Sequence, residues 1–188
     1  MKKKLNNQFL FYLIPLLLGV ITSFSLPPYN LFFLNFFTFP LFFICFIYNF
    51  KKKKTVCFIT GWLFGFGYFI SNIYWITNSL TFEEIFKPLI PIALFIIPLF
   101  LGLFYGLATY VCSFFKLAKD YSSVLLFALL ISIFEYLRGV ILGGFPWNLT
   151  AYSWTYYIDF LQILKLIGTY SFNLITITLF LMPTVFFF

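Results

Sequence analysis

The chain has 188 residues, of which 63% are hydrophobic and 9% are charged, and it carries a net charge of +7. Because soluble domains have about 25% charged residues, this composition excludes a soluble globule and predicts an all-α integral membrane protein. The positive charge stands in short blocks at the edges of apolar runs, which is typical of membrane topology and argues against nucleic-acid binding. We expect residues 1–188 to form one transmembrane domain.

Six apolar runs are predicted to span the membrane, since a helix needs about 20 apolar residues to cross a bilayer. The turn at residues 25–30 shows no small-residue cleavage site, so we interpret the first run as an uncleaved span rather than a signal peptide. Pro98 is expected to kink the fourth span. The expected spans are residues 9–24, 31–50, 56 to about 77, 88 to about 115, 121 to about 142, and about 160 to the C-terminus.

The basic residues fall unequally at the two ends of these spans. Nine lie at one end and three at the other. Because cytoplasmic loops are enriched in Lys and Arg, this asymmetry predicts a cytoplasmic N-terminus and an outward-facing loop at residues 143–154. The nine are Lys2, Lys3, Lys4, Lys51, Lys52, Lys53, Lys54, Lys116 and Lys119, and the three are Lys87, Arg138 and Lys165.

Two pairs of glycines have the spacing that lets helix backbones approach closely. Gly61 and Gly65 lie in the third predicted span, and Gly102 and Gly106 in the fourth. Such pairs serve either packing within one bundle or association of two chains. We favour packing within the bundle, because glycine is common in spanning helices.

Metal, disulfide and cofactor sites are not expected. The sequence has no His, and its three cysteines, Cys45, Cys57 and Cys112, have no paired spacing and fall toward the predicted cytoplasmic side. Acyl transfer or hydrolysis usually needs a nucleophile with a base within hydrogen-bond reach, and the outer loops offer neither His nor Cys. Glu83 and Glu84 are adjacent in a polar loop and are expected to be solvated.

The segment around residues 135–154 is the candidate functional site. Glu135 and Arg138 are three residues apart, so they share a helical face and can pair, and a structural ion pair is favoured over catalysis. Two glycines and Pro146 then shape a stiff turn with an amphipathic Trp147. We predict a loop that contacts lipid; an ordinary aromatic-rich connection is the alternative. The candidate lipid-binding residues are Glu135, Arg138, Phe145, Pro146 and Trp147.

In this interpretation Arg138 attracts a lipid phosphate with its guanidinium snorkelling outward, and Trp147 anchors the loop at the level of the headgroups. The residues from Glu135 to Gly139 and from Gly144 to Trp147 resemble the E-x-L-R-G and G-F-P-W signature of bacterial apolipoprotein N-acyltransferases. Residues 24–28, 61–67, 75–80 and 162–173 also resemble that family in order and spacing.

This resemblance implies an enzyme of the bacterial inner membrane that moves an acyl chain from phospholipid to the α-amine of a diacylglyceryl-Cys lipoprotein. Family members also carry an outer nitrilase-like domain with a Glu-Lys-Cys triad. No position here matches that triad, so no catalytic residue is assigned. We expect a truncated or split chain that is inactive alone, whose partners are phospholipid and lipoprotein acyl chains and a separate nitrilase-like domain.

Two other functions stay open from the sequence. A non-enzymatic membrane remnant or scaffold would also lack a triad. A small membrane transporter is disfavoured, because transporters place charged residues and broken helices near the midplane, often in repeated halves, and these spans are nearly free of internal charge and show no repeat.

Overall fold

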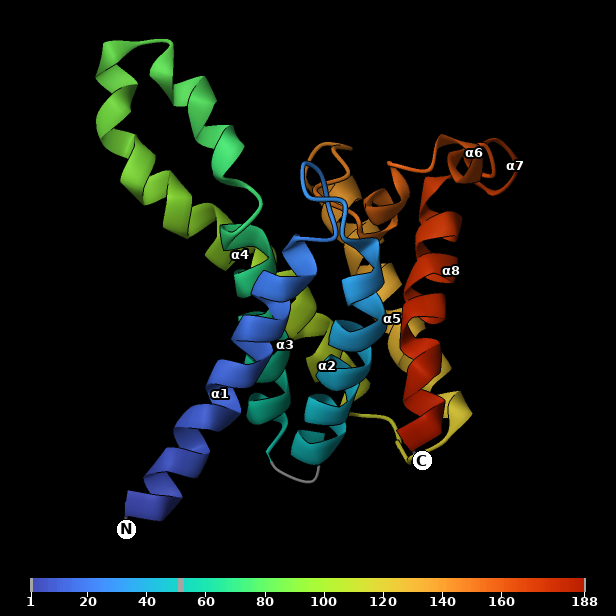
Figure 1. The fold of residues 1–188 in the computed structure, drawn as a ribbon. Helices are drawn as coiled ribbons and strands as arrows, with labels where there is room; N and C mark the ends of the chain where they lie inside the picture. Colours follow the sequence, from blue (N-terminus) through green and yellow to red (C-terminus); the bar gives the residue numbers. More distant parts are fainter. Residues whose placement is uncertain (1, 51–52, 188) are drawn as a thin grey trace.

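The computed structural model describes residues 2–50 and 53–187, with side chains from residue 12 onward. Within these ranges the secondary structure is helical and contains no strand. Long helices run side by side as a bundle (Figure 1). The long helices are α1 (Lys2–Ser23), α2 (Asn35–Phe50), α3 (Lys54–Ile70), α4 (Ile90–Cys112), α5 (Tyr121–Ile141) and α8 (Thr169–Leu181).

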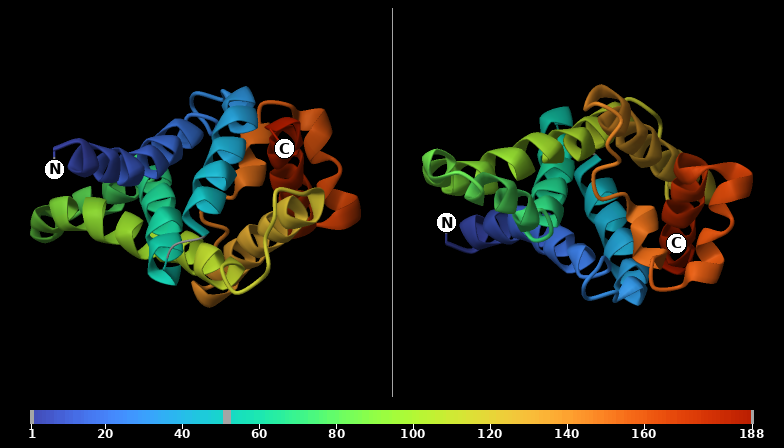
Figure 2. Two further views of the ribbon diagram at one scale, coloured as in Figure 1. Left: turned by 90° about the horizontal axis from the view of Figure 1, so that it is seen from below. Right: turned by 90° about the horizontal axis from the view of Figure 1, so that it is seen from above.

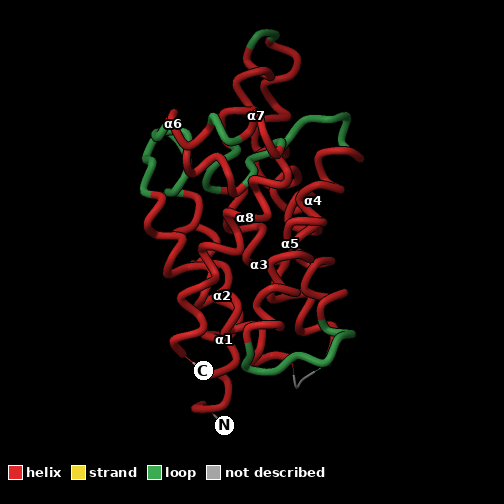
Figure 3. The backbone as a smooth tube through the Cα atoms, turned by 90° about the vertical axis from the view of Figure 1, so that its right-hand side faces the viewer, coloured by secondary structure: helices red, strands yellow, loops and turns green. Residues whose placement is uncertain are grey.

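Short helices fill the connections between the long ones. Most of them lie in the loops at one end of the bundle, as the tube in Figure 3 shows. They are η1 (Phe32–Leu34), η2 (Tyr74–Thr81), η3 (Glu84–Leu89), η4 (Thr150–Trp154), α6 (Ile158–Leu161), α7 (Leu164–Ile167) and η5 (Met182–Phe187).

The prediction of an all-α membrane bundle is confirmed, but the number of spans that qualify is smaller than six. Among the described residues, four helical segments are long and apolar enough to cross a membrane, and α3 with η2 makes a fifth if that pair, bent by 50°, is one span. The apolar part of α1 with described side chains is shorter. The four are Phe32–Phe50, Glu84–Cys112, Tyr121–Ile141 and Thr169–Phe187.

One predicted boundary is wrong, and another holds only for a bent span. Helix α3 itself ends at Ile70 rather than near residue 77, although η2 continues the bent pair to Thr81. Asn72, just beyond α3, donates a hydrogen bond to the backbone oxygen of Ser23 (3.1 Å). The last long helix begins at Thr169 rather than near residue 160, because Gly168 has a φ of +77° that no helix continues through. Both boundaries depend on local backbone geometry, which cannot be inferred from the length of an apolar run.

Helix α3 is packed closely between α1 and α4. A Cβ added to Gly65 would lie 2.9 Å from the Cα of Gly102, and one added to Gly67 would lie 2.2 Å from the backbone oxygen of Leu16. A Cβ on Gly106 would meet the ring of Phe58 at 2.9 Å. The predicted role of the glycine pairs in packing within the bundle is therefore confirmed.

Phenylalanine rings fill the centre between α2, α3 and α5. The rings of Phe42 and Phe64 stack at a centroid distance of 3.9 Å, and Phe127 packs edge-on against Phe42 at 5.4 Å and Phe43 at 5.1 Å. All four side chains are fully buried. Aromatic pairs of this kind add about 0.5–1.5 kcal/mol each beyond the burial of their area.

The bundle has two distinct ends. The lysine end holds Lys53, Lys54 and the connection at residues 113–120, and both described termini lie there (Figure 1). The loop end holds the connections at residues 24–34, 71–89 and 142–168. From the loop end a hairpin leans away from the bundle (Figures 1 and 2). We call this hairpin, residues 74–97, the arm; it comprises η2, η3 and the first two turns of α4.

Candidate functional site

The carboxylate of Glu135 is the centre of a buried polar network near the loop end. Its side chain is 1% exposed and accepts hydrogen bonds from three other elements. The hydroxyl of Tyr105 in α4 donates to Oε1, as does Oγ1 of Thr150 (3.2 Å), and Nδ2 of Asn173 in α8 donates to Oε2 (2.5 Å). A buried carboxylate needs such partners, so the network ties α4, α5, α8 and η4 together.

Arg138 lies next to this carboxylate and is also fully buried, at 0% exposure. Its Nη2 is 3.9 Å from Oε1 of Glu135 and donates to the backbone oxygen of Trp147 at 2.6 Å. Its guanidinium carbon lies 4.9 Å from the centroid of the Phe69 ring. The predicted ion pair is confirmed. The predicted outward snorkelling of Arg138 is wrong, because the loop folds over the guanidinium and supplies a carbonyl to it.

The loop after α5 has the stiff, glycine-dependent shape that the sequence predicts. Gly143 and Gly144 have φ values of +81° and +83°. The N–H of Gly144 bonds to the Gly139 oxygen at 2.8 Å, which ends the helix, and the N–H of Trp147 bonds to the Phe145 oxygen at 2.9 Å across Pro146. The chain is thereby turned back over the end of α5.

Buried side chains hold this loop from below. The hydroxyl of Tyr68 in α3 donates to the Asn148 oxygen at 3.0 Å, and Nδ2 of Asn148 donates to Oδ1 of Asn72 at 2.5 Å. The backbone N–H of Ala151 donates to Oδ1 of Asn173 at 2.9 Å. Asn173 therefore bridges the loop backbone and the Glu135 carboxylate. Tyr68, Tyr105 and Asn173 were missed from the sequence, although each is a polar group inside an apolar run.

The five predicted site residues divide into two sets. Glu135 and Arg138 are buried, whereas Phe145 is 48% exposed and Pro146 and Trp147 are half-buried. The rings of Phe145 and Trp147 contact each other edge to face at 5.0 Å. The hydrogen bond from Arg138 to the Trp147 oxygen joins the two sets. We call residues 143–147 the lip.

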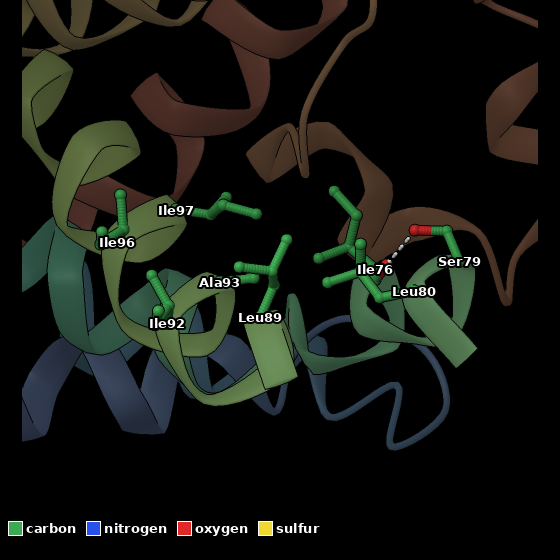
Figure 4. Close-up of a pocket in the computed structure, with 8 residues that line it drawn as sticks. All are labelled: Ile76, Ser79, Leu80, Leu89, Ile92, Ala93, Ile96 and Ile97. Carbon is green, nitrogen blue, oxygen red and sulfur yellow. Dashed lines mark hydrogen bonds between the residues drawn. The ribbon is translucent and has the colours of Figure 1, made fainter. Parts of the chain in front are cut away.

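An apolar groove lies within the arm, between η2 on one side and Leu89 with the first two turns of α4 on the other. Its volume is ≈ 370 Å³. The one hydroxyl in its lining, that of Ser79, already donates to the Ile76 oxygen at 2.7 Å, so no lining side chain offers a free polar group (Figure 4). Such a groove suits a hydrocarbon chain rather than a charged group. It is lined by Ile76, Ser79, Leu80, Leu89, Ile92, Ala93, Ile96 and Ile97.

The groups that could carry covalent or metal chemistry lie elsewhere. Cys57 and Cys112 are buried near the start of α3 and the end of α4, at the lysine end. Across the described ranges there is no group of three or more His, Cys, Asp or Glu side chains that could hold a metal. Glu83 is exposed, and Glu84 forms an exposed pair with Lys87 at 2.5 Å, so both are solvated as predicted.

A family described as the apolipoprotein N-acyltransferase N-terminal domain matches residues 18–181. The chain belongs to the apolipoprotein N-acyltransferase family. An apolipoprotein N-acyltransferase of Rhodopseudomonas palustris is 33% identical over 181 residues, covering 92% of this chain and 33% of that protein. One from Rickettsia prowazekii is 36% identical over 167 residues, covering 88% of this chain and 32% of that protein.

The chain spans about a third of the length of these apolipoprotein N-acyltransferases. The matched range contains Glu135, Arg138 and the lip, together with Tyr68, Tyr105 and Asn173. It contains both walls of the groove as well. The resemblance inferred from the signature residues is therefore confirmed at the level of the family, and the apolar helices together with membrane-enzyme relatives indicate a multi-pass membrane protein.

Proposed function

We propose that this chain provides the membrane domain of an apolipoprotein N-acyltransferase and that its groove holds a lipid acyl chain during transfer. The reaction moves an acyl chain from a phospholipid to the α-amine of a diacylglyceryl-Cys lipoprotein. The observation that carries this proposal is the apolar groove of ≈ 370 Å³ at the loop end, the same end as the lip. An acyl chain in it would keep its ester at the level of the outer loops.

The residues of this chain bind and orient, and they do not supply the reacting groups. Transfer of an acyl group needs a nucleophile and a base, and at the loop end the sequence offers neither His nor Cys. The nitrilase-like domain implied by the family resemblance supplies those groups. We therefore propose that residues 1–188 have no acyltransferase activity by themselves.

Within this domain the candidate residues have two roles. Phe145, Pro146 and Trp147 contact lipid at the surface, where amphipathic rings prefer the headgroup region. Glu135 and Arg138 position that surface, because Arg138 donates its hydrogen bond to the Trp147 backbone rather than to a lipid phosphate. This assignment retains the lip as a lipid-binding element and makes the ion pair its support.

We propose that the lysine end faces the cytoplasm and that the groove and lip face outward, in a bacterial inner membrane. Nine of the twelve basic residues belong to the lysine end by their place in the chain, which fits the enrichment of Lys and Arg in cytoplasmic loops. In this orientation the groove would lie on the side of the membrane where a diacylated lipoprotein N-terminus receives its third acyl chain.

The test uses a bacterium whose own apolipoprotein N-acyltransferase can be depleted. Residues 1–188 are expressed alone and together with a separately encoded nitrilase-like domain, and the mass of a reporter lipoprotein N-terminus is measured. We expect a triacylated reporter only when both are present. Ile92→Trp, which fills the groove, should reduce triacylation, whereas Phe95→Trp, on an exposed arm position outside the groove lining, should not.

A reporter that stays diacylated while both chains accumulate in the membrane would reject the enzymatic role and would favour the alternative of a non-enzymatic scaffold. Equal triacylation by the two tryptophan variants would reject the groove as the acyl-chain site. Accessibility of Lys53 and Lys54 to a membrane-impermeant amine reagent in intact cells would reject the proposed orientation.

A further inference from the structure

The side chain of Asn72 joins two other parts of the loop end. Asn72 lies in the short break between α3 and η2, residues 71–73. Its Nδ2 donates to the backbone oxygen of Ser23, the last residue of α1, at 3.1 Å, and its Oδ1 accepts from Nδ2 of Asn148 at 2.5 Å. Asn148 directly follows the lip. Both polar groups of this amide are therefore used, and each reaches a different segment of the chain.

The break that contains Asn72 is also one of the two places where the arm is attached to the bundle. At this break α3 and η2 are bent by 50°. The other attachment is α4, where the buried Pro98 directly follows the arm and has no N–H to complete the helical hydrogen bonds. Hinge motions in proteins occur at such positions, where helices end or are interrupted. The direction of the arm (Figure 1) therefore depends on side-chain contacts at the break, which include both hydrogen bonds of Asn72.

Asn148 is held at the same place through its backbone and through its side chain. Its φ is +37°, a left-handed value that residues other than glycine adopt rarely and that asparagine tolerates. Its backbone oxygen accepts from the hydroxyl of Tyr68, near the end of α3, at 3.0 Å, while its amide donates to Asn72. A strained residue keeps its conformation when several contacts determine it. The loop that carries the lip is thus fixed to the end of α3, from which the arm departs.

We propose that Asn72 is a positioning residue whose amide couples the direction of the arm to the position of the lip. The arm carries the apolar groove, and the groove wall formed by η2 begins two residues after Asn72. With the bond to Asn148 intact, the groove and the lip keep one relative position; without it, each moves separately. The consequence for acyl transfer rests on the proposed function, because an acyl chain in the groove would then present its ester at a fixed distance from the lip.

The coupling is tested by the distance between the arm and the lip, which depends on no reaction. Spin labels are attached through Ile85→Cys, at an exposed position of the arm, and Phe145→Cys in the lip. Alanine first replaces the three native cysteines, and pulsed electron resonance in detergent then gives the distances. We expect a narrow distribution in this parent chain. Asn148→Gly should broaden it, because glycine keeps the positive φ and the bond from Tyr68 but has no amide side chain.

Asn30→Gly is the matched control. Asn30 is the other described non-glycine residue with a positive φ, +55°, and its amide donates locally to the Pro28 oxygen at 3.2 Å. This change should leave the distribution narrow, since it removes an amide from the loop end without separating the arm from the lip. Asn72→Ala should broaden the distribution, and adding Asn148→Gly to it should broaden it no further, because the two changes break the same bond.

Acyl transfer by the purified chain with the separately encoded nitrilase-like domain provides the second readout. Asn148→Gly should lower kcat per folded chain by about three- to tenfold and leave the KM for phospholipid within about twofold. The groove would still bind the acyl chain, but it would no longer hold the ester at a fixed position relative to the lip. Asn30→Gly should change neither constant. A purely structural role would lower the amount of folded protein and leave kcat per folded chain unchanged.

A narrow distribution in Asn148→Gly, in a chain that unfolds at the temperature of the parent, would overturn the coupling. Equal broadening by Asn30→Gly would overturn it as well, since the loop end would then be loosened in general. A raised KM at unchanged kcat would assign the bond to lipid binding and reject positioning.

Two remaining outcomes are separated by the design. Absence of transfer by the parent chain with its nitrilase-like domain would reject the proposed function, and the distance measurement would still decide the coupling. If Asn72→Ala does not accumulate in the membrane, Asn148→Gly supplies the comparison alone, because it keeps the bond from Asn72 to the Ser23 oxygen.

Discussion

Helix α3 together with residues 98–112 of α4, which we call the packed half, differs from the arm. In the packed half the two helices touch backbone to backbone, with Gly65 against Gly102, and side chains such as Tyr105 are 2% exposed. In the arm, Phe95 is 56% exposed and Phe82 is 87% exposed. The first two turns of α4, residues 90–97, are as apolar in sequence as the rest of that helix, but their side chains are exposed or half-buried.

This difference shows that hydrophobicity alone does not tell packing from lipid contact. In the packed half, small residues determine how closely the helices approach, so added volume has no space to occupy. In the arm, apolar surface remains uncovered, and exposed apolar patches of this kind mark sites of membrane or ligand contact. The packed half also supplies Tyr105 of α4 to the network around Glu135 of α5, which in turn accepts a hydrogen bond from Asn173 of α8.

The largest expected effect comes from removing the Glu135 carboxylate from the buried network. Glu135→Leu removes the carboxylate and leaves the Arg138 guanidinium buried without its counter-ion, which should cost about 3–5 kcal/mol of folding stability. Glu135→Gln keeps an acceptor oxygen and should cost less. The level of each variant in the membrane and its thermal unfolding after purification check this. Unfolding of Glu135→Leu at the temperature of the unaltered chain would mean that the network is not structural.

Adding bulk to the packed half should have the next largest effect. Gly65→Leu drives a side chain into the Gly102 backbone and should destabilise the chain by about 1–3 kcal/mol or prevent its accumulation. Ala93→Leu adds bulk to the arm, where the open groove can take it, and should leave stability unchanged. The same thermal unfolding measurement compares the two. Equal losses of stability in the two variants would contradict the distinction between the packed half and the arm.

A smaller effect is expected where a single hydrogen bond supports the loop. Tyr68→Phe removes the bond to the Asn148 oxygen and should cost about 0.5–1.5 kcal/mol. Tyr74→Phe, on an exposed tyrosine of the arm, is the matched control. Amide hydrogen exchange of residues 143–151 should be faster in Tyr68→Phe and unchanged in the control. Unchanged exchange in both variants would show that other contacts suffice to hold the loop.

The elements that follow from local sequence were predictable. Apolar runs gave the long helices, the i,i+3 spacing gave the pair of Glu135 and Arg138, and two glycines with a proline gave the turn of the lip. Each of these depends on residues within a few positions of one another. The close contact of Gly65 with Gly102 was predictable as a type of packing, although not as that particular pair.

The partners of the network were not predictable, because they come from distant parts of the chain. Tyr105 lies 30 residues before Glu135 and Asn173 lies 38 residues after it. Which polar residue in an apolar run meets which other one depends on how the helices are arranged in space. The burial of Arg138 was not predicted either, because it depends on how the loop folds back so that the Trp147 carbonyl accepts a hydrogen bond from the guanidinium.

The smallest expected effect concerns the start of α5, which is held differently from its end. At its end near the lip the helix is fixed by the buried network, whereas at its start only the exposed Asp120 carboxylate caps it, accepting from the N–H of Ser123 at 2.8 Å. Hydrogen bonds from Ser123 lower the pKa of Asp120 below its ordinary value of 3.8. A carboxyl with a lowered pKa stabilises the fold above its unfolded pKa, and this contribution is lost as the pH falls through the folded pKa.

We therefore expect the cap to be intact at neutral pH and to be lost only below about pH 4. Asp120→Ala should lower the thermal unfolding temperature slightly at pH 7 and less at pH 3, whereas Asp120→Asn should retain most of the cap at both values. Because solvent screens this exposed group, its loss should leave hydrogen exchange at the lip unchanged. A change at the lip in Asp120→Ala would mean that the two ends of α5 are coupled through the helix rather than fixed separately.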